Sequence, residues 1–161
     1  MPNKKQLIEL VITALTQELQ QAIDAANDAH AAAIDDQSVA ETQYDTLAIE
    51  ASYLAEGLSR RVAEFQQSIE AYKALDIIEF NSNSHITLGA LVQLSADFKT
   101  HHWFFIGPAA GGFRCQLAEQ NITIITPQSP MGTALIGKQQ DDDITIMLGA
   151  NKLEDYITEL K

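Results

Sequence analysis

The apolar residues in the first part of the chain repeat with the spacing of a coiled coil. The steps between them alternate between four and three residues, and together they span more than three heptads. They are Ile8, Ile12, Leu15, Leu19, Ala22, Ala26, Ala29 and Ala33. Such a seam predicts a long helix that buries one narrow face against a partner helix.

A second run of apolar residues follows with similar spacing. Its members are Ala40, Tyr44, Leu47, Ala51, Leu54, Leu58 and Phe65. The two runs predict an antiparallel hairpin, because the position numbers of facing residues add up to one constant value, as for Leu19 and Leu54. Arg61 is the exception, since it falls opposite Ile12. We expect its stem to lie along the seam with its head in water, and Val62 to fill the gap.

The turn of this hairpin is predicted at residues 34–38. Ser38 and Glu41 have the spacing of a capping box, which would start the second helix. A two-helix hairpin has no interior in which a pocket could form, so its function must lie on its surface or at its tip.

Glycine and proline divide the chain into two parts. Residues 1–75 hold one glycine and one proline, whereas residues 76–161 hold seven glycines and three prolines. Because both residue types interrupt regular helices and mark turns, the second part must turn often. We therefore predict a coiled-coil hairpin in residues 1–78 and a globular domain in residues 79–161.

Short apolar runs separated by turn residues predict an antiparallel sheet in the globular domain, and with it an α+β fold. Residues 131–137 are expected to form a short helix capped by Gly137, and Asp141–Asp143 an acidic turn. The expected strands are one or two around Gly89 (85–88 and 91–94), then 103–106, 122–126, 144–148 and 156–160.

The charge balance excludes several classes of partner. Lysine and arginine number 10 against 22 for aspartate and glutamate, so the net charge is −12. This acidity argues against sequence-specific DNA binding and against an anionic membrane, because both call for basic patches. No apolar run is long enough to span a bilayer, and Gln6 and Glu9 interrupt the apolar stretch that a secretory signal would need. We expect a cytoplasmic monomer.

The central part of the predicted hairpin carries charges of one sign. Ten acidic residues and no lysine or arginine lie between Lys5 and Arg60. A solvated coiled coil usually mixes both signs, since opposite charges four residues apart stabilise a helix. The stretch therefore favours either a soluble, self-repelling surface or a probe that enters a basic channel of a partner.

The remaining polar motifs predict no complete active site. His101 and His102 are adjacent but lack further ligands at metal-binding spacing, and Cys115, the single cysteine, lies in no nucleophile motif. Gly111 and Gly112 lack the lysine and hydroxyl of a phosphate loop, and no Ser-His-Asp series stands out.

Three segments of the second part resemble the Gre transcript-cleavage factors (GreA/GreB). Ser129–Lys138, followed by Asp141–Asp143 and Ile144, is similar to the Ser-Pro, Ala-Leu-Ile-Gly-Lys and acidic-turn block of that family. Ile86–Leu94 resembles the opening strand of its C-terminal domain, and Trp103–Gly107 resembles its aromatic strand. With the hairpin, the resemblance spans essentially the whole chain.

The resemblance implies a role in transcription. Gre factors bind bacterial RNA polymerase through an FKBP-like globular domain, and Ser129, Pro130 and Met131 would belong to its docking surface. The coiled coil enters the secondary channel, where acidic tip residues help to hold a second Mg²⁺ that promotes cleavage of backtracked RNA. Such a factor is not an enzyme by itself and binds no cofactor alone, since it supplies carboxylates that share the polymerase Mg²⁺.

The tip matches the family only in part. When the family serine is matched to Ser38, the metal-assisting aspartate falls on Asp36. The family glutamate then falls on Val39 and the family glycine on Asp35. Asp35 is the candidate for the missing carboxylate. Glu41 is a weaker candidate, because the capping box also explains it.

Three functions remain open. The chain is expected to stimulate cleavage with Asp35 and Asp36, or to occupy the channel and regulate or inhibit polymerase without stimulating cleavage. The third alternative is a polymerase-independent protein-interaction module, which would need an exposed apolar groove in the globular domain.

Overall fold

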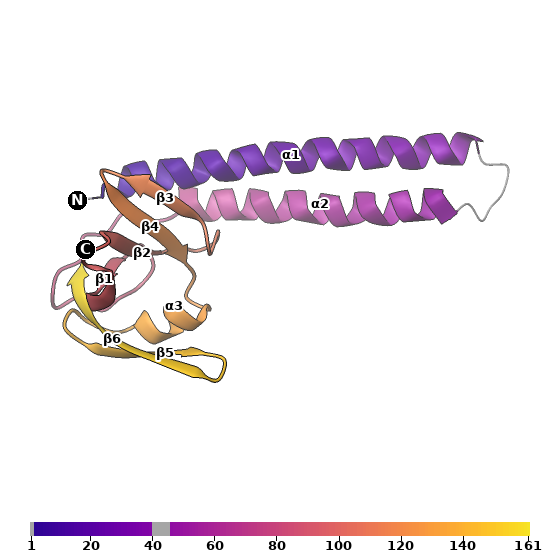
Figure 1. Ribbon diagram of the computed structural model, residues 1–161. Helices are drawn as coiled ribbons and strands as arrows, with labels where there is room; N and C mark the ends of the chain where they lie inside the picture. Colours follow the sequence, from indigo (N-terminus) through magenta and orange to yellow (C-terminus); the bar gives the residue numbers. More distant parts are fainter. Residues whose placement is uncertain (1, 40–45) are drawn as a thin grey trace. The chain divides into compact units, whose positions relative to one another are not determined.

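The chain adopts an α+β fold, as predicted. The computed structural model describes residues 2–39 and 46–161, with the backbone alone for 35–39 and 46–48. Two long helices precede a six-stranded sheet and a short helix (Figure 1). No helix in the described part of the chain is long and apolar enough to cross a membrane.

The residues group into two compact units. The hairpin unit consists of Ile12–Glu70, and the sheet unit consists of Met1–Val11 together with Ala71–Lys161. The first turns of the first helix and the last turn of the second helix therefore belong to the sheet unit. The division into domains 1–78 and 79–161 stays a prediction.

The hairpin unit is built from α1 (Lys4–Val39) and α2 (Thr46–Lys73), which run in opposite directions (Figure 1). The predicted seam of α1 is confirmed, because its members are buried or, for Ile12 and Leu19, half-buried, while the neighbouring Ile34 is 61% exposed. The buried seam residues within this unit are Leu15, Ala22, Ala26, Ala29 and Ala33.

The seam of α2 follows the prediction at the half-buried Ala51, Leu58 and Phe65 but differs at one position. Ala55 is buried, whereas Leu54 is 58% exposed, so the predicted facing pair of Leu19 and Leu54 is wrong. A helix buries one stripe, and adjacent residues point about 100° apart, so a stripe through Ala55 excludes Leu54. The stripe continues through the buried or half-buried Leu58, Val62, Phe65 and Ile69.

The prediction for Val62 is confirmed, and that for Arg61 is confirmed as far as the exposure of its side chain. Arg61 is exposed, and its guanidinium carbon lies 5.4 Å from the centroid of the Phe65 ring. Val62 is half-buried and takes the place in the stripe that Arg61 leaves.

Helix α1 continues through residues 34–38, where the turn was predicted. Ser38 lies inside α1 rather than ahead of α2, so the predicted cap of the second helix is wrong. No glycine or proline occurs between Pro2 and Gly57, so no backbone breaker ends the helix at residue 34. The predicted seam positions Ala40 and Tyr44 lie outside the described residues.

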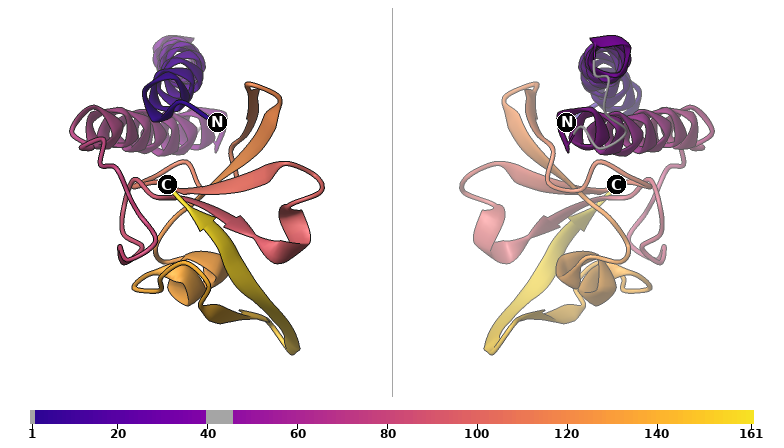
Figure 2. Two further views of the ribbon diagram at one scale, coloured as in Figure 1. Left: turned by 90° about the vertical axis from the view of Figure 1, so that its left-hand side faces the viewer. Right: turned by 90° about the vertical axis from the view of Figure 1, so that its right-hand side faces the viewer.

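The sheet unit contains six strands in the order β3-β4-β2-β1-β6-β5 (Figures 1 and 2). A 3-10 turn, η1 (Ser95–Asp97), follows the first strand, and the short helix α3 (Pro130–Leu135) follows the fourth. The strands are β1 (Leu91–Leu94), β2 (His102–Ile106), β3 (Arg114–Leu117), β4 (Gln120–Ile125), β5 (Asp143–Leu148) and β6 (Asn151–Leu160).

The sheet is mixed rather than antiparallel, which corrects the prediction. Strand β4 pairs antiparallel with β3 but parallel with β2. Strand β3 was not predicted, and this extra strand reverses the chain once more before β4 joins β2. Residues 85–88 are not a strand, although Ile86 forms backbone hydrogen bonds with Gly137 and Lys138.

One face of the sheet carries the main apolar cluster, which includes Leu135 of α3. Phe104 of β2 and Ile125 of β4 belong to this cluster. Because side chains alternate between faces along a strand, His102 and Thr123 point to the same face as Phe104 and Ile125. The face therefore changes from apolar to polar along β2 and β4.

Two side chains tie the helix ends of the sheet unit to its loops. The Tyr72 hydroxyl donates a hydrogen bond to the Ala109 carbonyl at 2.6 Å, and burial raises the pKa of Tyr72, so the proton stays in place. Lys4 Nζ donates to the Ile78 carbonyl at 2.7 Å and lies 4.5 Å from the centroid of the Phe80 ring.

Candidate functional site

The predicted tip residues fall at the far end of α1. Asp35 and Asp36 are helical, and nothing is described of their side chains. Glu41 lies outside the described residues. Within the part of the chain whose side chains are described, no three histidine, cysteine, aspartate or glutamate residues gather as a metal site. The assignment of Mg²⁺-assisting carboxylates stays a prediction.

The Ser129–Met131 segment starts helix α3, close to where the sequence predicts a short helix. The Ser129 hydroxyl donates to the Thr126 carbonyl at 2.7 Å and accepts from the Gly132 amide at 3.0 Å. Pro130 occupies the first turn, where its missing N–H costs nothing. Gly137 follows with φ of +83°, the left-handed conformation expected of a helix end.

The exposure of this segment is uneven. Pro130 is exposed and Ser129 is half-buried, whereas Met131 packs against the apolar cluster. Pro130 is therefore the member of the three that offers most surface to a docking partner. Whether the segment docks on a polymerase stays a prediction.

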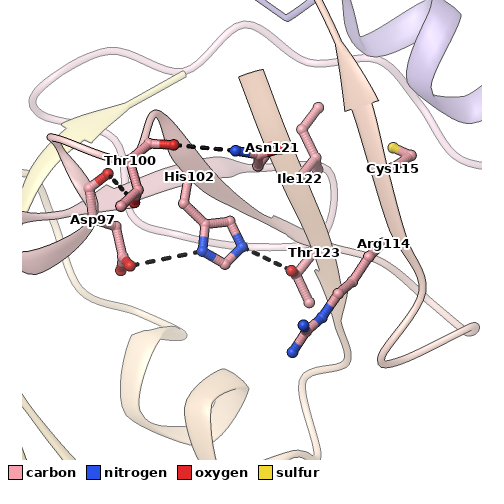
Figure 3. A pocket seen from close by; sticks show the side chains of 8 residues that line it. All are labelled: Asp97, Thr100, His102, Arg114, Cys115, Asn121, Ile122 and Thr123. Atoms are coloured by element: carbon pink, nitrogen blue, oxygen red, sulfur yellow. Dashed lines mark hydrogen bonds and ion pairs between the residues drawn. The ribbon is translucent and has the colours of Figure 1, made fainter. Parts of the chain in front are cut away.

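A pocket that the sequence analysis did not predict lies at the polar end of the sheet face (Figure 3). Its volume is about 570 Å³. Its walls come from η1, the loop before β2, and strands β2, β3 and β4. The lining residues are Asp97, Thr100, His102, Arg114, Cys115, Asn121, Ile122 and Thr123.

The imidazole of His102 joins two of the lining residues. Its Nε2 lies 2.7 Å from the hydroxyl oxygen of Thr123, and its Nδ1 lies 3.6 Å from a carboxylate oxygen of Asp97 (Figure 3). The ring also packs against Phe104, with 4.6 Å between the ring centroids. Both ring nitrogens thus face a polar side chain, and the Phe104 ring supports one face of the imidazole.

The backbone around Asp97 is fixed by a chain of hydrogen bonds. The Thr100 hydroxyl donates to the Asp97 carbonyl at 3.0 Å, and the Asn121 amide donates to the Thr100 carbonyl at 3.2 Å. Burial raises the pKa of Asp97, and nearby Asp155 raises it further, while His102 opposes the shift. Burial also raises the pKa of Cys115, so its thiol is a weak nucleophile.

Local sequence patterns contain little that indicates this cluster. Asp97 and His102 are separated by a turn, and Thr123 comes from a strand whose pairing with β2 is parallel. That pairing depends on β3, which was missed. The one local signal was His102, which stands directly before the expected strand 103–106.

Comparisons with known proteins point to one group of structures. No protein-family model matches the sequence, and a search of curated proteins finds no match. Among solved structures, the chain is similar to GreA factor homolog 1 (Gfh1) of Thermus thermophilus, with 19% identity and a TM-score of 0.36. The match covers 93% of this chain and 94% of that one.

Two further structures belong to the same group. A structure described as the transcription factor Gfh1 has 18% identity and a TM-score of 0.38, with 92% of each chain covered. Gfh1 of Thermus aquaticus has 20% identity and a TM-score of 0.33, again with 92% of each chain covered. At such identities and TM-scores, an assignment of function must come from the residues themselves.

Proposed function

We propose that this chain is a Gre-type transcription factor, which binds bacterial RNA polymerase and places the tip of its hairpin in the secondary channel. There it stimulates Mg²⁺-dependent cleavage of backtracked RNA. The proposal rests on the Gre-like segments of the sequence and on the charge of the hairpin. The chain itself supplies carboxylates and leaves the chemistry to the polymerase.

The observation that carries the proposal is the acidic, base-free stretch between Lys5 and Arg60. The described part of this stretch lies on two antiparallel helices, and the 36 residues of α1 extend about 54 Å at 1.5 Å per residue. A narrow rod with one sign of charge forgoes helix-stabilising ion pairs. Electrostatic attraction to a basic partner, such as a channel that holds nucleic acid, compensates for the missing ion pairs.

Asp36 and Asp35 are the residues that would assist the metal. Mg²⁺ prefers carboxylate oxygens and water, and often takes only one or two protein carboxylates. When bound, the ion activates a water and neutralises charge on the phosphate. Ser129, Pro130 and Met131 would dock the sheet unit on the polymerase, with the exposed Pro130 as the main contact.

Val39 favours a second candidate function. It stands where the resemblance places the family glutamate, and a valine cannot bind a metal ion. A chain with the hairpin but without the second carboxylate would occupy the channel and regulate or inhibit the polymerase. The two functions share the partner and differ only in cleavage.

The test is RNA cleavage in stalled, backtracked complexes of bacterial RNA polymerase at fixed Mg²⁺. Polymerase binding is measured in parallel for each variant. We expect the unmodified chain to accelerate cleavage, and Asp36→Ala to lower the acceleration by about tenfold or more, equivalent to 1.4 kcal/mol, with binding unchanged. Asp28→Ala is the matched control, because it removes one charge from the shaft of the same helix and should leave cleavage intact.

Other outcomes decide between the alternatives. Binding without acceleration, together with acceleration by Val39→Glu, would favour the channel-occupying regulator. Equal loss in Asp28→Ala and Asp36→Ala would mean that charge rather than a positioned carboxylate matters. Failure to bind polymerase would overturn both functions and leave the protein-interaction module.

A further inference from the structure

We infer that Thr123 is a nucleophile that accepts an acyl group from a small ester, with His102 as its general base. This activity goes beyond the proposed role in transcription and does not depend on it. It rests on the pocket described above, in which three side chains from separate elements stand in the order carboxylate, imidazole and hydroxyl (Figure 3).

The distances suit proton transfer from the hydroxyl. A general base must lie about 2.6–3.2 Å from the atom whose proton it takes, and Thr123 Oγ1 lies 2.7 Å from His102 Nε2. The carboxylate of Asp97 faces the other nitrogen, Nδ1, at 3.6 Å. A carboxylate on that side favours the tautomer with the proton on Nδ1, which leaves Nε2 free to accept.

Rigid elements hold the three groups. Thr123 lies within β4 and is 9% exposed, and His102 begins the neighbouring β2. The Phe104 ring supports the imidazole, and Thr100 holds the backbone of Asp97. Sites built on strands keep their geometry better than sites built on loops, so little reorganisation is needed before reaction.

Arg114 supplies the positive charge that the reaction needs. It is the direct cross-strand partner of Thr123, which puts the two Cβ atoms about 4.5–5.5 Å apart. It is the one lining residue with a permanent positive charge, and it forms no ion pair within the described part of the chain. A guanidinium beside the nucleophile can stabilise the oxyanion that forms when a carbonyl is attacked.

The step balances without any further reactant. Thr123 Oγ1 bonds to the acyl carbon, and the hydroxyl proton passes to His102 Nε2. The bond between the acyl carbon and the alkoxy oxygen breaks, and the leaving oxygen keeps the electron pair and takes a proton from His102 or water. The products are an acyl ester of Thr123 and an alcohol. Water then hydrolyses that ester by the same proton path.

The experiment uses the full chain with p-nitrophenyl acetate as the probe. All proteins carry Cys115→Ala, so that the thiol in the same pocket cannot react. Acetylated residues are identified by peptide mass spectrometry, and p-nitrophenolate release gives the rate. Thr158 is the internal control, because it is a half-buried hydroxyl on β6 that donates to the Gln93 carbonyl and has no histidine beside it.

We expect acetylation of Thr123 to exceed that of Thr158 by at least about tenfold, and His102→Gln to lower it by about 100-fold. Thr123→Ser should react faster, because a primary hydroxyl is less hindered, and Thr123→Val should not react. Arg114→Gln should slow the reaction. Asp97 positions the imidazole without touching the ester, so Asp97→Asn should slow the acetylation of Thr123, and Asp97→Glu should restore part of the rate.

Three results would overturn the inference. They are equal acetylation of Thr123 and Thr158, an unchanged rate in His102→Gln, and no faster reaction in Thr123→Ser. Circular dichroism shows whether each variant folds. Should His102→Gln not fold, the comparison of Thr123 with Thr158 in the folded parent chain still tests the inference.

Discussion

Ala118 and Glu119 form the turn that joins β3 to β4, and both have positive φ, of 50° and 62°. Two such residues between paired Leu117 and Gln120 are typical of a type I′ turn, which strongly prefers Asn-Gly. Neither alanine nor glutamate adopts this conformation readily. The hairpin therefore carries no turn signal in its sequence, and this is why β3 was missed and the sheet was predicted to be antiparallel.

We expect Glu119→Gly to stabilise the sheet unit by about 0.5–1 kcal/mol. Glycine reaches positive φ without the steric cost that a Cβ imposes. Thermal unfolding followed by circular dichroism measures the change. Glu154→Gly, at an exposed position inside β6, is the control and should destabilise the chain. A lower melting temperature for Glu119→Gly would show that the turn relies on the glutamate side chain.

Lys4 makes stability depend on pH in the alkaline range. Burial lowers the pKa of Lys4 to about 8, with Glu79 opposing the shift, against 10.5 for an ordinary lysine. Between these pH values the unfolded chain binds more protons than the folded chain. The free energy of unfolding should therefore rise with pH from about 8 to 10.5 through this group.

The measurement compares urea unfolding of the unmodified chain and Lys4→Met across this pH range. The difference between their free energies of unfolding isolates Lys4 from other groups that titrate there. The free energy of unfolding of the unmodified chain should increase relative to that of Lys4→Met as pH rises, because the buried ammonium loses its charge. A difference that stays constant with pH would contradict the burial of the charged group.

At the scale of elements, close backbone approach fixes where α3 sits. A Cβ on Gly132 would collide with the Thr126 carbonyl oxygen and lie 2.8 Å from its carbon. The helix can therefore start beside the end of β4 only because residue 132 has no side chain. The same approach lets Ser129 bond to both Thr126 and the Gly132 amide.

Gly132→Ala should destabilise the chain by about 1–3 kcal/mol, as overpacked sites do. Gly57→Ala is the matched control, since its Cβ would meet only the end of Arg60 at 4.0 Å. Alanine is favoured over glycine inside a helix, so this control should stabilise the chain by about 1 kcal/mol. Thermal melts of both variants provide the test, and equal effects would contradict the close approach at α3.

The elements also show which patterns the sequence carried and which it did not. The seam of α1 could be predicted because its alternating four- and three-residue spacing continues without a break over more than three heptads, although apolar neighbours such as Val11 and Ile34 stand beside it. In α2, Leu54 and Ala55 are both apolar, and spacing from the tip selected the wrong one. The choice between them depends on the buried stripe that continues to Phe65 and Ile69. That stripe is set by tertiary packing, which a local sequence pattern does not specify.

At the scale of the whole molecule, the charge of −12 and its concentration on the hairpin should make stability depend on salt. Like charges repel in the folded helices, and salt screens them over about 10 Å at 0.1 M. We expect the melting temperature to rise as sodium chloride increases. A melting temperature that stays flat or falls would show that the acids are already neutralised by contacts within the fold.

Asp28→Lys supplies a matched variant for this experiment. It places a base four residues after Asp24 on the same helix, which should add about 0.3–0.5 kcal/mol at low salt. Because it removes repulsion, its melting temperature should respond less to salt than that of the unmodified chain. An equal salt response in both proteins would mean that the repulsion lies elsewhere in the molecule.

The candidate sites, like the elements of the fold, divide into features that local sequence specifies and features that depend on long-range packing. The cap at Ser129 and the first-turn Pro130 act within a few residues of each other, so local sequence specifies them, whereas their role in docking stays a prediction. The Asp97–His102–Thr123 cluster was not predictable, because it requires the register of a parallel strand pair that no local signal specifies. The tip residues Asp35 and Asp36 were assigned by resemblance, and their role stays a prediction.

The hairpin unit interrupts the sheet unit in the sequence, and this bears on how the chain folds. Lys4 and Ile78, whose groups bond in the sheet unit, are separated by the whole of Ile12–Glu70. Closing a loop of that length as a random coil carries an entropic cost, and such long-range contacts slow folding. A hairpin made of local helical contacts can form first and shorten the loop. During synthesis, the hairpin is complete before the strands emerge, so its early folding would prepare the start of α1 to receive them.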